Sequence, residues 1–152
     1  MIQRKQSLFL LIDAILCIIC LMLPLGIFRP QQIGVDTTLY NLWIRLGDGS
    51  TNWQSAPLFA ILLIHVAISI YTIFIYSKRK LQIKLCTWNI AILVLWYVVG
   101  AIVVFTTGKE LEADFKAGFS AILPIISLIL VVMARKGVKA DEALIRAADR
   151  IR

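Results

Sequence analysis

The chain has 152 residues, of which 60% are hydrophobic and only 16% are charged, and its mean hydropathy is +0.85. Soluble domains are about 45–50% apolar and about 25% charged, so this composition excludes an ordinary soluble domain and indicates a membrane protein. The length leaves room for one domain and excludes a multidomain enzyme. The formal net charge of +7 would suit a nucleic-acid partner only if the basic residues formed one patch.

Four apolar stretches are long enough to cross a hydrocarbon core about 30 Å thick, which takes roughly 20 helical residues. Because a backbone in lipid must satisfy its own hydrogen bonds, and the stretches exceed a barrel strand of about ten residues, we expect helices. The sequence therefore predicts an all-α membrane protein, a four-transmembrane-helix bundle within residues 1–137. The predicted spans are Ser7–Phe28, Pro57–Ser77, Lys84–Phe105 and Ala117–Ala134. We expect Pro124 to kink the fourth span.

The basic residues flanking the spans predict their orientation, because short cytoplasmic segments are enriched in Lys and Arg. The outer loops, 29–56 and 106–116, carry four of the sixteen basic residues. The other twelve lie on the opposite side: Arg4, Lys5, Lys78, Arg79, Lys80, Lys84, Arg135, Lys136, Lys139, Arg146, Arg150 and Arg152. We therefore expect a multi-pass protein with both termini cytoplasmic. Because three separate cytoplasmic segments share the charge, we expect no nucleic-acid partner.

Two segments outside the spans have local structure of their own. In the first outer loop a β-prone run, Thr37–Leu46, precedes the turn residues Gly47–Ser50, which predicts a small β-hairpin. Residues 138–152 read as a short amphipathic cytoplasmic helix, in which Asp141 caps the start and Glu142 can pair with the residue four positions on. Such a short helix is marginal alone, so we expect it to dock on the membrane, on the cytoplasmic turn or on another protein.

The cytoplasmic turn and the tail contain the candidate contacts to anionic lipid or to a partner. A basic cluster at a membrane surface attracts anionic lipid by about 1 kcal/mol per charge, although a topology anchor needs no further role. The candidate residues are Lys78, Arg79, Lys80, Lys84, Arg146, Arg150 and Arg152.

Asp13 and His65 are the ionisable residues inside the predicted spans, and such residues are functional candidates because they are costly in lipid. At 1.5 Å per residue, Asp13 lies about 9 Å from the cytoplasmic ends of the spans. At similar depths, about 7–12 Å, the other spans place the remaining members of a candidate polar layer: Ser69, Asn89 and Ser127. The layer is either an ion or substrate path or a set of hydrogen bonds that join the helices, and without a base at the same depth the second reading is preferred. His65, about 18 Å deep, is interpreted as a packing residue.

Cys17 and Cys20 form a Cys-x-x-Cys motif on the same helix face as Asp13 and Pro24. The motif is similar to that of the quinone-linked disulfide-generating membrane enzymes. Those enzymes need a second pair of cysteines in an outer loop, and neither outer loop here contains one. We therefore interpret these cysteines as small apolar residues of the helix interface and expect no metal and no cofactor.

Several stretches resemble a known family. They are the opening Met1–Arg4, the stretch from Trp53 to Cys86 that includes the basic turn, and the charged close Asp141–Arg152. In these the chain is similar to a Bacteroidota inner-membrane family catalogued as domain of unknown function 4293. The resemblance covers essentially the whole chain and implies four transmembrane helices in the bacterial inner membrane. It implies no activity, cofactor or catalytic residue.

Three hypotheses about function follow. The first is a non-catalytic accessory or assembly subunit in the lipid bilayer that acts through its cytoplasmic turn and tail on a membrane-protein partner or as a homo-oligomer. The second is a small proton- or ion-coupled transporter that uses Asp13. The third is a membrane thiol redox enzyme that uses Cys17 and Cys20.

Overall fold

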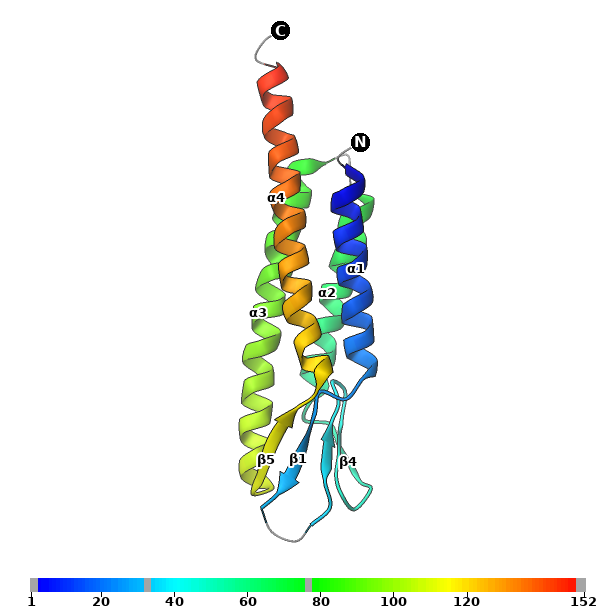
Figure 1. Cartoon of the computed structure of the whole chain (residues 1–152), viewed down its shortest axis with the longest axis vertical. Helices are drawn as coiled ribbons and strands as arrows, with labels where there is room; N and C mark the ends of the chain where they lie inside the picture. The colour runs from blue at the N-terminus through cyan, green and yellow to red at the C-terminus, as the bar shows by residue number, and fades with distance from the viewer. Residues whose placement is uncertain (1–2, 32–33, 76–77, 150–152) are drawn as a thin grey trace.

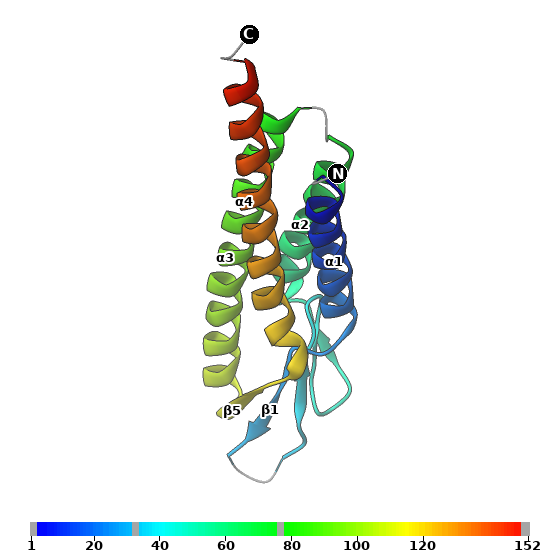
Figure 2. The same ribbon diagram turned by 45° about the horizontal axis from the view of Figure 1, so that its top comes forward.

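The structure, a computed structural model, describes residues 3–31, 34–75 and 78–149. Its four α-helices lie side by side in an elongated bundle with a small antiparallel sheet at one end (Figures 1 and 2). The helices are α1 (Gln3–Met22), α2 (Ala56–Phe74), α3 (Arg79–Glu110) and α4 (Leu123–Asp149). α1 begins and α4 ends at the opposite end of the bundle from the sheet, which we name the terminal end (Figure 1). The prediction of four helices is confirmed.

Three helices in the described part of the chain are long and apolar enough to cross a membrane. They are α2, α3 and the continuous helical stretch Phe119–Ile145, which combines the short 3₁₀ turn η1 (Phe119–Ile122) with most of α4. α1 is apolar over Gln6–Met22 but shorter. The helices therefore have the lengths and compositions of a membrane protein.

α1 ends at Met22, before the predicted end of the first span at Phe28. Proline at position 24 explains the difference, because it has no N–H to donate to the carbonyl four residues earlier and its ring clashes there. The carbonyl left without a helical partner is that of Cys20, and the side-chain amide of Asn41 donates a hydrogen bond to it at 2.7 Å. The last part of the predicted span instead forms the first strand.

The sheet joins the two segments predicted as outer loops. Its strands are β1 (Gly26–Pro30), β2 (Thr37–Leu39), β3 (Ile44–Arg45), β4 (Thr51–Asn52) and β5 (Ala113–Ala117), in the order β4-β3-β2-β1-β5. β3 and β4 form the predicted hairpin, with Ile44 opposite Asn52. The sequence predicted β1 as the end of the first span and the start of the first outer loop, and β5 as the end of the second outer loop and the first residue of the fourth span. In the structure the two pair antiparallel, with Phe28 opposite Phe115. The sequence analysis missed this pairing because its partners are almost 90 residues apart.

The apolar core continues from the helices into the sheet. Phe28, Leu39 and Ile44 are fully buried and belong to the same packed cluster as Leu58 and Trp96 of the helices. The sheet is therefore seated on the end of the bundle, and its position sets where α1 stops and where α4 starts.

α3 and α4 are longer than the predicted spans. α3 extends beyond 84–105 at both ends. α4 begins at Leu123, so Pro124 lies in its first turn, directly after the 3₁₀ turn η1, and not midway along a span that starts at Ala117. α4 then continues to Asp149, so residues 138–149, predicted as part of a separate short helix, are the last part of α4.

Candidate functional site

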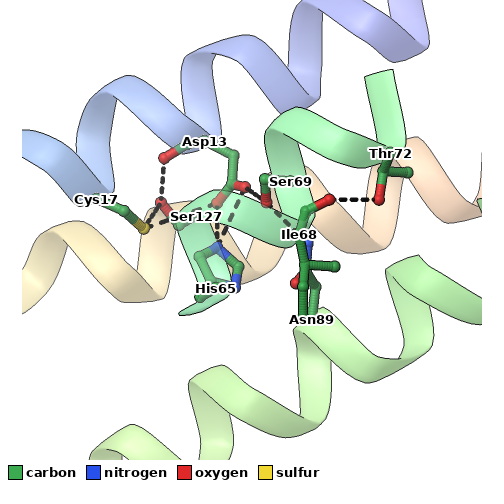
Figure 3. Close-up of polar contacts among 8 residues, drawn as sticks. All are labelled: Asp13, Cys17, His65, Ile68, Ser69, Thr72, Asn89 and Ser127. Carbon is green, nitrogen blue, oxygen red and sulfur yellow. Dashed lines mark hydrogen bonds and ion pairs between the residues drawn. The ribbon is translucent and has the colours of Figure 1, made fainter. Parts of the chain in front are cut away.

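A network of buried polar side chains lies in the middle of the bundle around Asp13 (Figure 3). Nε2 of His65 lies 3.1 Å from Oδ1 and 3.2 Å from Oδ2 of the Asp13 carboxyl group. Ser69 donates a hydrogen bond to Asp13 Oδ2 at 2.6 Å, and Asn89 donates through Nδ2 to Ser69 Oγ at 2.7 Å. All four side chains have 0% exposure. We name this network, with Cys17 and Ser127, the Asp13 centre.

Cys17 and Ser127 complete the Asp13 centre on its other side. The thiol of Cys17 lies 3.9 Å from Asp13 Oδ1 and donates to Ser127 Oγ at 3.3 Å. Ser127 in turn donates to the backbone carbonyl of Asp13 at 3.4 Å. Both side chains are fully buried. All four helices therefore contribute to the centre.

Helical spacing explains how these residues converge. Asp13 and Cys17 are four residues apart on α1, and His65 and Ser69 are four residues apart on α2, so each pair shares one helix face. Asn89 and Ser127 supply the contacts from α3 and α4 (Figure 3). The four residues of the predicted polar layer are thus brought together in one hydrogen-bonded network.

The prediction that His65 lies at a different depth from Asp13 was wrong. That depth was counted from span ends that the helices do not have. α1 begins at Gln3 and α2 ends at Phe74, so Asp13 is ten residues and His65 nine residues from the terminal end of its helix. At 1.5 Å per residue both lie about 14–15 Å from that end. Asp13 therefore has a base at its own depth.

The Asp13 centre also contains a group of side chains of the kinds that bind metals. One ligand atom each from Asp13, Cys17 and His65 lies within 4.8 Å of the other two. Sequence reasoning missed this group because it set His65 at another depth. Cys20, the other half of the Cys-x-x-Cys motif, instead contacts Asn41, and both cysteines are free thiols.

Two buried polar atoms in the centre, Nδ1 of His65 and Oδ1 of Asn89, have no hydrogen-bond partner among the residues that the structure describes. Native proteins leave few buried polar groups unpaired, and such groups call for an explanation in terms of a ligand, a water or a functional role. Because Ser69 bonds Asn89 and lies one helical turn from His65, both unpaired atoms belong to the same network.

Of the basic residues predicted as lipid or partner contacts, those that the structure describes lie at the terminal end. Lys78, Lys80 and Lys84 are exposed. Arg79 is half-buried and donates to the backbone carbonyl of Asp141 at 3.3 Å. Arg146 belongs to α4, but its side chain, together with Arg150 and Arg152, lies outside the described residues.

An apolar cavity of about 280 Å³ lies beside α3, where the bundle meets the sheet. Its walls include Trp96, Tyr97 and Phe115. The indole N–H of Trp96 donates to Asn41, and the Tyr97 hydroxyl donates to the carbonyl of Ala121, so the polar groups of the aromatic walls are already bonded within the protein. The cavity therefore offers apolar contact and little hydrogen bonding.

A comparison with curated proteins finds no match. A family model does match, over residues 2–151, which is nearly the entire chain. The resemblance noted in the sequence is thereby confirmed, and the chain belongs to the family described as domain of unknown function DUF4293.

Proposed function

We propose that this protein is a multi-pass protein of the bacterial inner membrane, of Bacteroidota origin, with four spans and both termini cytoplasmic. Three long apolar helices and the apolar part of α1 support the four spans. The excess of Lys and Arg at the terminal end supports the orientation. The sheet would then lie on the outer surface, with the exposed side chains of Trp43 and Trp53 at the interface that tryptophan favours.

Within this membrane protein we propose a small ion-coupled transporter that binds a cation, a proton or a metal ion, at the Asp13 centre. The observation that carries the proposal is the 3.1 Å contact between His65 Nε2 and Asp13 Oδ1 in the fully buried middle of the bundle. Ionisable groups at this depth cost a few kcal/mol to insert, and in membrane proteins they mark ion and proton pathways.

The paired base favours transport over a purely structural role for Asp13. One uncharged hydrogen-bonding residue would suffice to join two helices, and such bonds contribute only about 0.6–2 kcal/mol. An acid and a base in contact, with Ser69 bonded to the second oxygen of the acid, form a group whose charge can change when a cation enters or leaves. Helix joining requires no such group.

Reconstitution into proteoliposomes tests the proposal. Gradients of H⁺, Na⁺, K⁺ and Zn²⁺ are imposed one at a time, and flux is read with trapped pH-sensitive or ion-sensitive dyes. We expect one cation to move in the wild type, Asp13→Asn to abolish that flux, and Asp141→Asn, which changes the buried carboxylate at the terminal end, to retain it. Absence of flux for all four cations, or full flux in Asp13→Asn, would contradict the proposal.

Site-specific labelling tests the proposed orientation in intact cells. Single cysteines are introduced at Gly49, in the β3–β4 turn, and at Lys80, in the turn between α2 and α3, with the native cysteines replaced by serine. A membrane-impermeant maleimide should label position 49 in intact cells and position 80 only after lysis. The reverse pattern would overturn the orientation.

We propose an accessory or assembly role through the turn and tail as a second candidate, because one observation favours it. α4 extends beyond the start of α1 (Figures 1 and 2), and Leu144 and Ile145 on this extension are 63% and 43% exposed. Exposed apolar side chains at the end of a helix are typical of a contact with another protein or with lipid.

Crosslinking followed by purification in mild detergent tests this role. Truncation after Ala143 removes the apolar extension and retains Asp141, which α1 contacts. We expect the wild type to carry a stoichiometric partner and the truncated chain, as well as the double variant Leu144→Ser, Ile145→Ser, to lose it. A wild-type chain that is crosslinked to no other protein would exclude the role.

A further inference from the structure

Asp13, Cys17 and His65 contribute three different donor atoms to one buried point between α1 and α2. The carboxylate oxygen Oδ1 lies 3.1 Å from the imidazole Nε2 and 3.9 Å from the thiol sulfur. Around a tetrahedral Zn²⁺, with bonds of about 2.0 Å to oxygen and nitrogen and about 2.3 Å to sulfur, an oxygen–nitrogen pair is about 3.3 Å apart and an oxygen–sulfur pair about 3.5 Å apart. The first measured separation is slightly shorter and the second slightly longer than these values, by a few tenths of an ångström that side-chain rotation can supply.

The charges of the three ligands suit a dication in a buried site. A carboxylate, a thiolate and a neutral imidazole together carry two negative charges, so a bound M²⁺ ion leaves the group neutral. Burying a net charge costs several kcal/mol, whereas a neutral coordination group avoids most of that cost. The thiol of Cys17 releases its proton when the metal–sulfur bond forms.

Two of the three donor residues, Asp13 and Cys17, already have a second partner of the kind that orients a metal ligand. Ser69 bonds the other oxygen of Asp13, and Ser127 lies 3.3 Å from the sulfur of Cys17. A metal on Nε2 of His65 places the ring hydrogen on Nδ1, because a neutral imidazole carries one hydrogen. Ligating histidines usually donate that hydrogen to a nearby acceptor.

The unpaired atoms of the Asp13 centre match this requirement. Nδ1 of His65 becomes a donor, and Oδ1 of Asn89, a member of the same network, is an acceptor without a partner. A rotation of the two side chains or one bridging water would join them once Nε2 is occupied. Metal binding would thus give a role to two buried atoms that have no partner within the described part of the chain.

We infer that Asp13, Cys17 and His65 form a site for a transition-metal dication, with Zn²⁺ as the best-suited ion. Mixed nitrogen, sulfur and oxygen ligands select Zn²⁺ and its neighbours over Mg²⁺ and Ca²⁺, which prefer oxygen. Three protein ligands leave the fourth position of a tetrahedral site for a water or another exchangeable group. This inference rests on the proposed function, because it names the cation that the Asp13 centre would carry.

Titration of the purified, detergent-solubilised protein with Co²⁺ tests the site, since Co²⁺ takes zinc geometries and its bond to a thiolate absorbs in the near ultraviolet. We expect one Co²⁺ to bind per chain and to give a thiolate charge-transfer band, which disappears when Zn²⁺ displaces the Co²⁺. Cys17→Ser should lose the band, whereas Cys20→Ser and Cys86→Ser, matched changes at the other buried cysteines, should keep it. Asn89→Ala should weaken binding by about 10–100-fold, the usual cost of removing an outer partner of a ligand.

X-ray absorption of the zinc-loaded wild type gives a second measurement that needs no folded variant. It should show one sulfur at about 2.3 Å together with nitrogen and oxygen ligands. Wild-type protein that binds neither metal, or a Co²⁺ band that survives in Cys17→Ser, overturns the site. If the wild type binds no metal but shows Asp13-dependent flux of H⁺, Na⁺ or K⁺, the metal site is refuted and the transporter proposal is supported. If it binds the metal but shows no flux of any cation, the transporter proposal is refuted and the metal site is supported.

Discussion

The side-chain amide of Gln6 donates a 2.6 Å hydrogen bond to a carboxylate oxygen of Asp141, across 135 residues of sequence. Both side chains are 9% exposed or less. The bond joins the second turn of α1 to the late part of α4. Arg79, at the start of α3, donates a hydrogen bond to the backbone carbonyl of the same Asp141. The segment predicted as a separate short helix that docks on another surface is thereby bonded to the bundle as the late part of α4.

Removing this contact should destabilise the terminal end. Asp141→Leu leaves the buried amide of Gln6 without a partner, and an unpaired buried polar group costs about 1–3 kcal/mol. We expect a corresponding loss in the free energy of unfolding, measured by denaturant titration in detergent micelles. Glu110→Gln, an exposed acid at the end of α3, serves as the control and should change stability by less than about 0.5 kcal/mol. Equal stabilities for the two variants would contradict this role of Asp141.

Asn41 should be a second stabilising residue, because it satisfies two groups at the junction of sheet and bundle. Its amide donates to the Cys20 carbonyl at 2.7 Å and accepts from the Trp96 indole at 3.2 Å. Asn41→Leu leaves the Cys20 carbonyl and the Trp96 N–H without a partner, which costs about 1–3 kcal/mol of stability for each buried group. We expect a clear drop in melting temperature in detergent. Trp88→Phe, a change at an exposed tryptophan, should have almost no effect on the melting temperature. An Asn41→Leu variant with the melting temperature of the wild type would disprove the stabilising role of Asn41.

Gly26 should be indispensable for the pairing of β1 with β5. A Cβ atom there would lie 2.5 Å from the carbonyl oxygen of Lys116 and 2.5 Å from the ring of Phe115. Gly26→Ala therefore forces the two strands apart, and we expect faster amide hydrogen exchange in both. At Gly100, in α3, the nearest atom would be a Leu58 methyl at 3.5 Å, which is ordinary contact. Gly100→Ala should accordingly leave exchange in the sheet unchanged; an identical response in the two variants would count against the close approach.

The β3–β4 turn should have an acid-sensitive element. The Ser50 hydroxyl and backbone N–H both donate to Asp48, and these bonds hold the pKa of that carboxyl below its usual range. The pKa of Asp48 is lower in the folded turn than in the unfolded chain. The two bonds therefore stabilise the turn fully at any pH above the pKa of the unfolded chain, and this stability is lost as the pH falls through the pKa of the folded turn. Ser50→Ala should raise the pKa of Asp48, as followed by the NMR shift of its carboxyl carbon, whereas Thr51→Ala should not. A pKa unchanged by Ser50→Ala would refute this cause.

Much of the architecture follows from sequence because it depends on neighbouring residues. Apolar length specifies the four helices, and the glycines at 47 and 49 with Asp48 mark the hairpin turn. The buried polar residues Asp13, Ser69, Asn89 and Ser127 could be singled out for the same reason, since polar side chains in apolar stretches are conspicuous. Their depths were similar enough to suggest one layer even with inexact helix ends.

Tertiary structure alone decided which residues meet. The pairing of His65 with Asp13 depends on where α1 begins and where α2 ends, and a shift of three or four residues moves a side chain by one helical turn, about 5 Å. The pairing of β1 with β5 joins segments almost 90 residues apart, and the bond from Gln6 to Asp141 joins the two ends of the chain. Hydropathy and helical periodicity are local quantities, so they predict the elements, whereas the register between elements is set by the packing of all of them together.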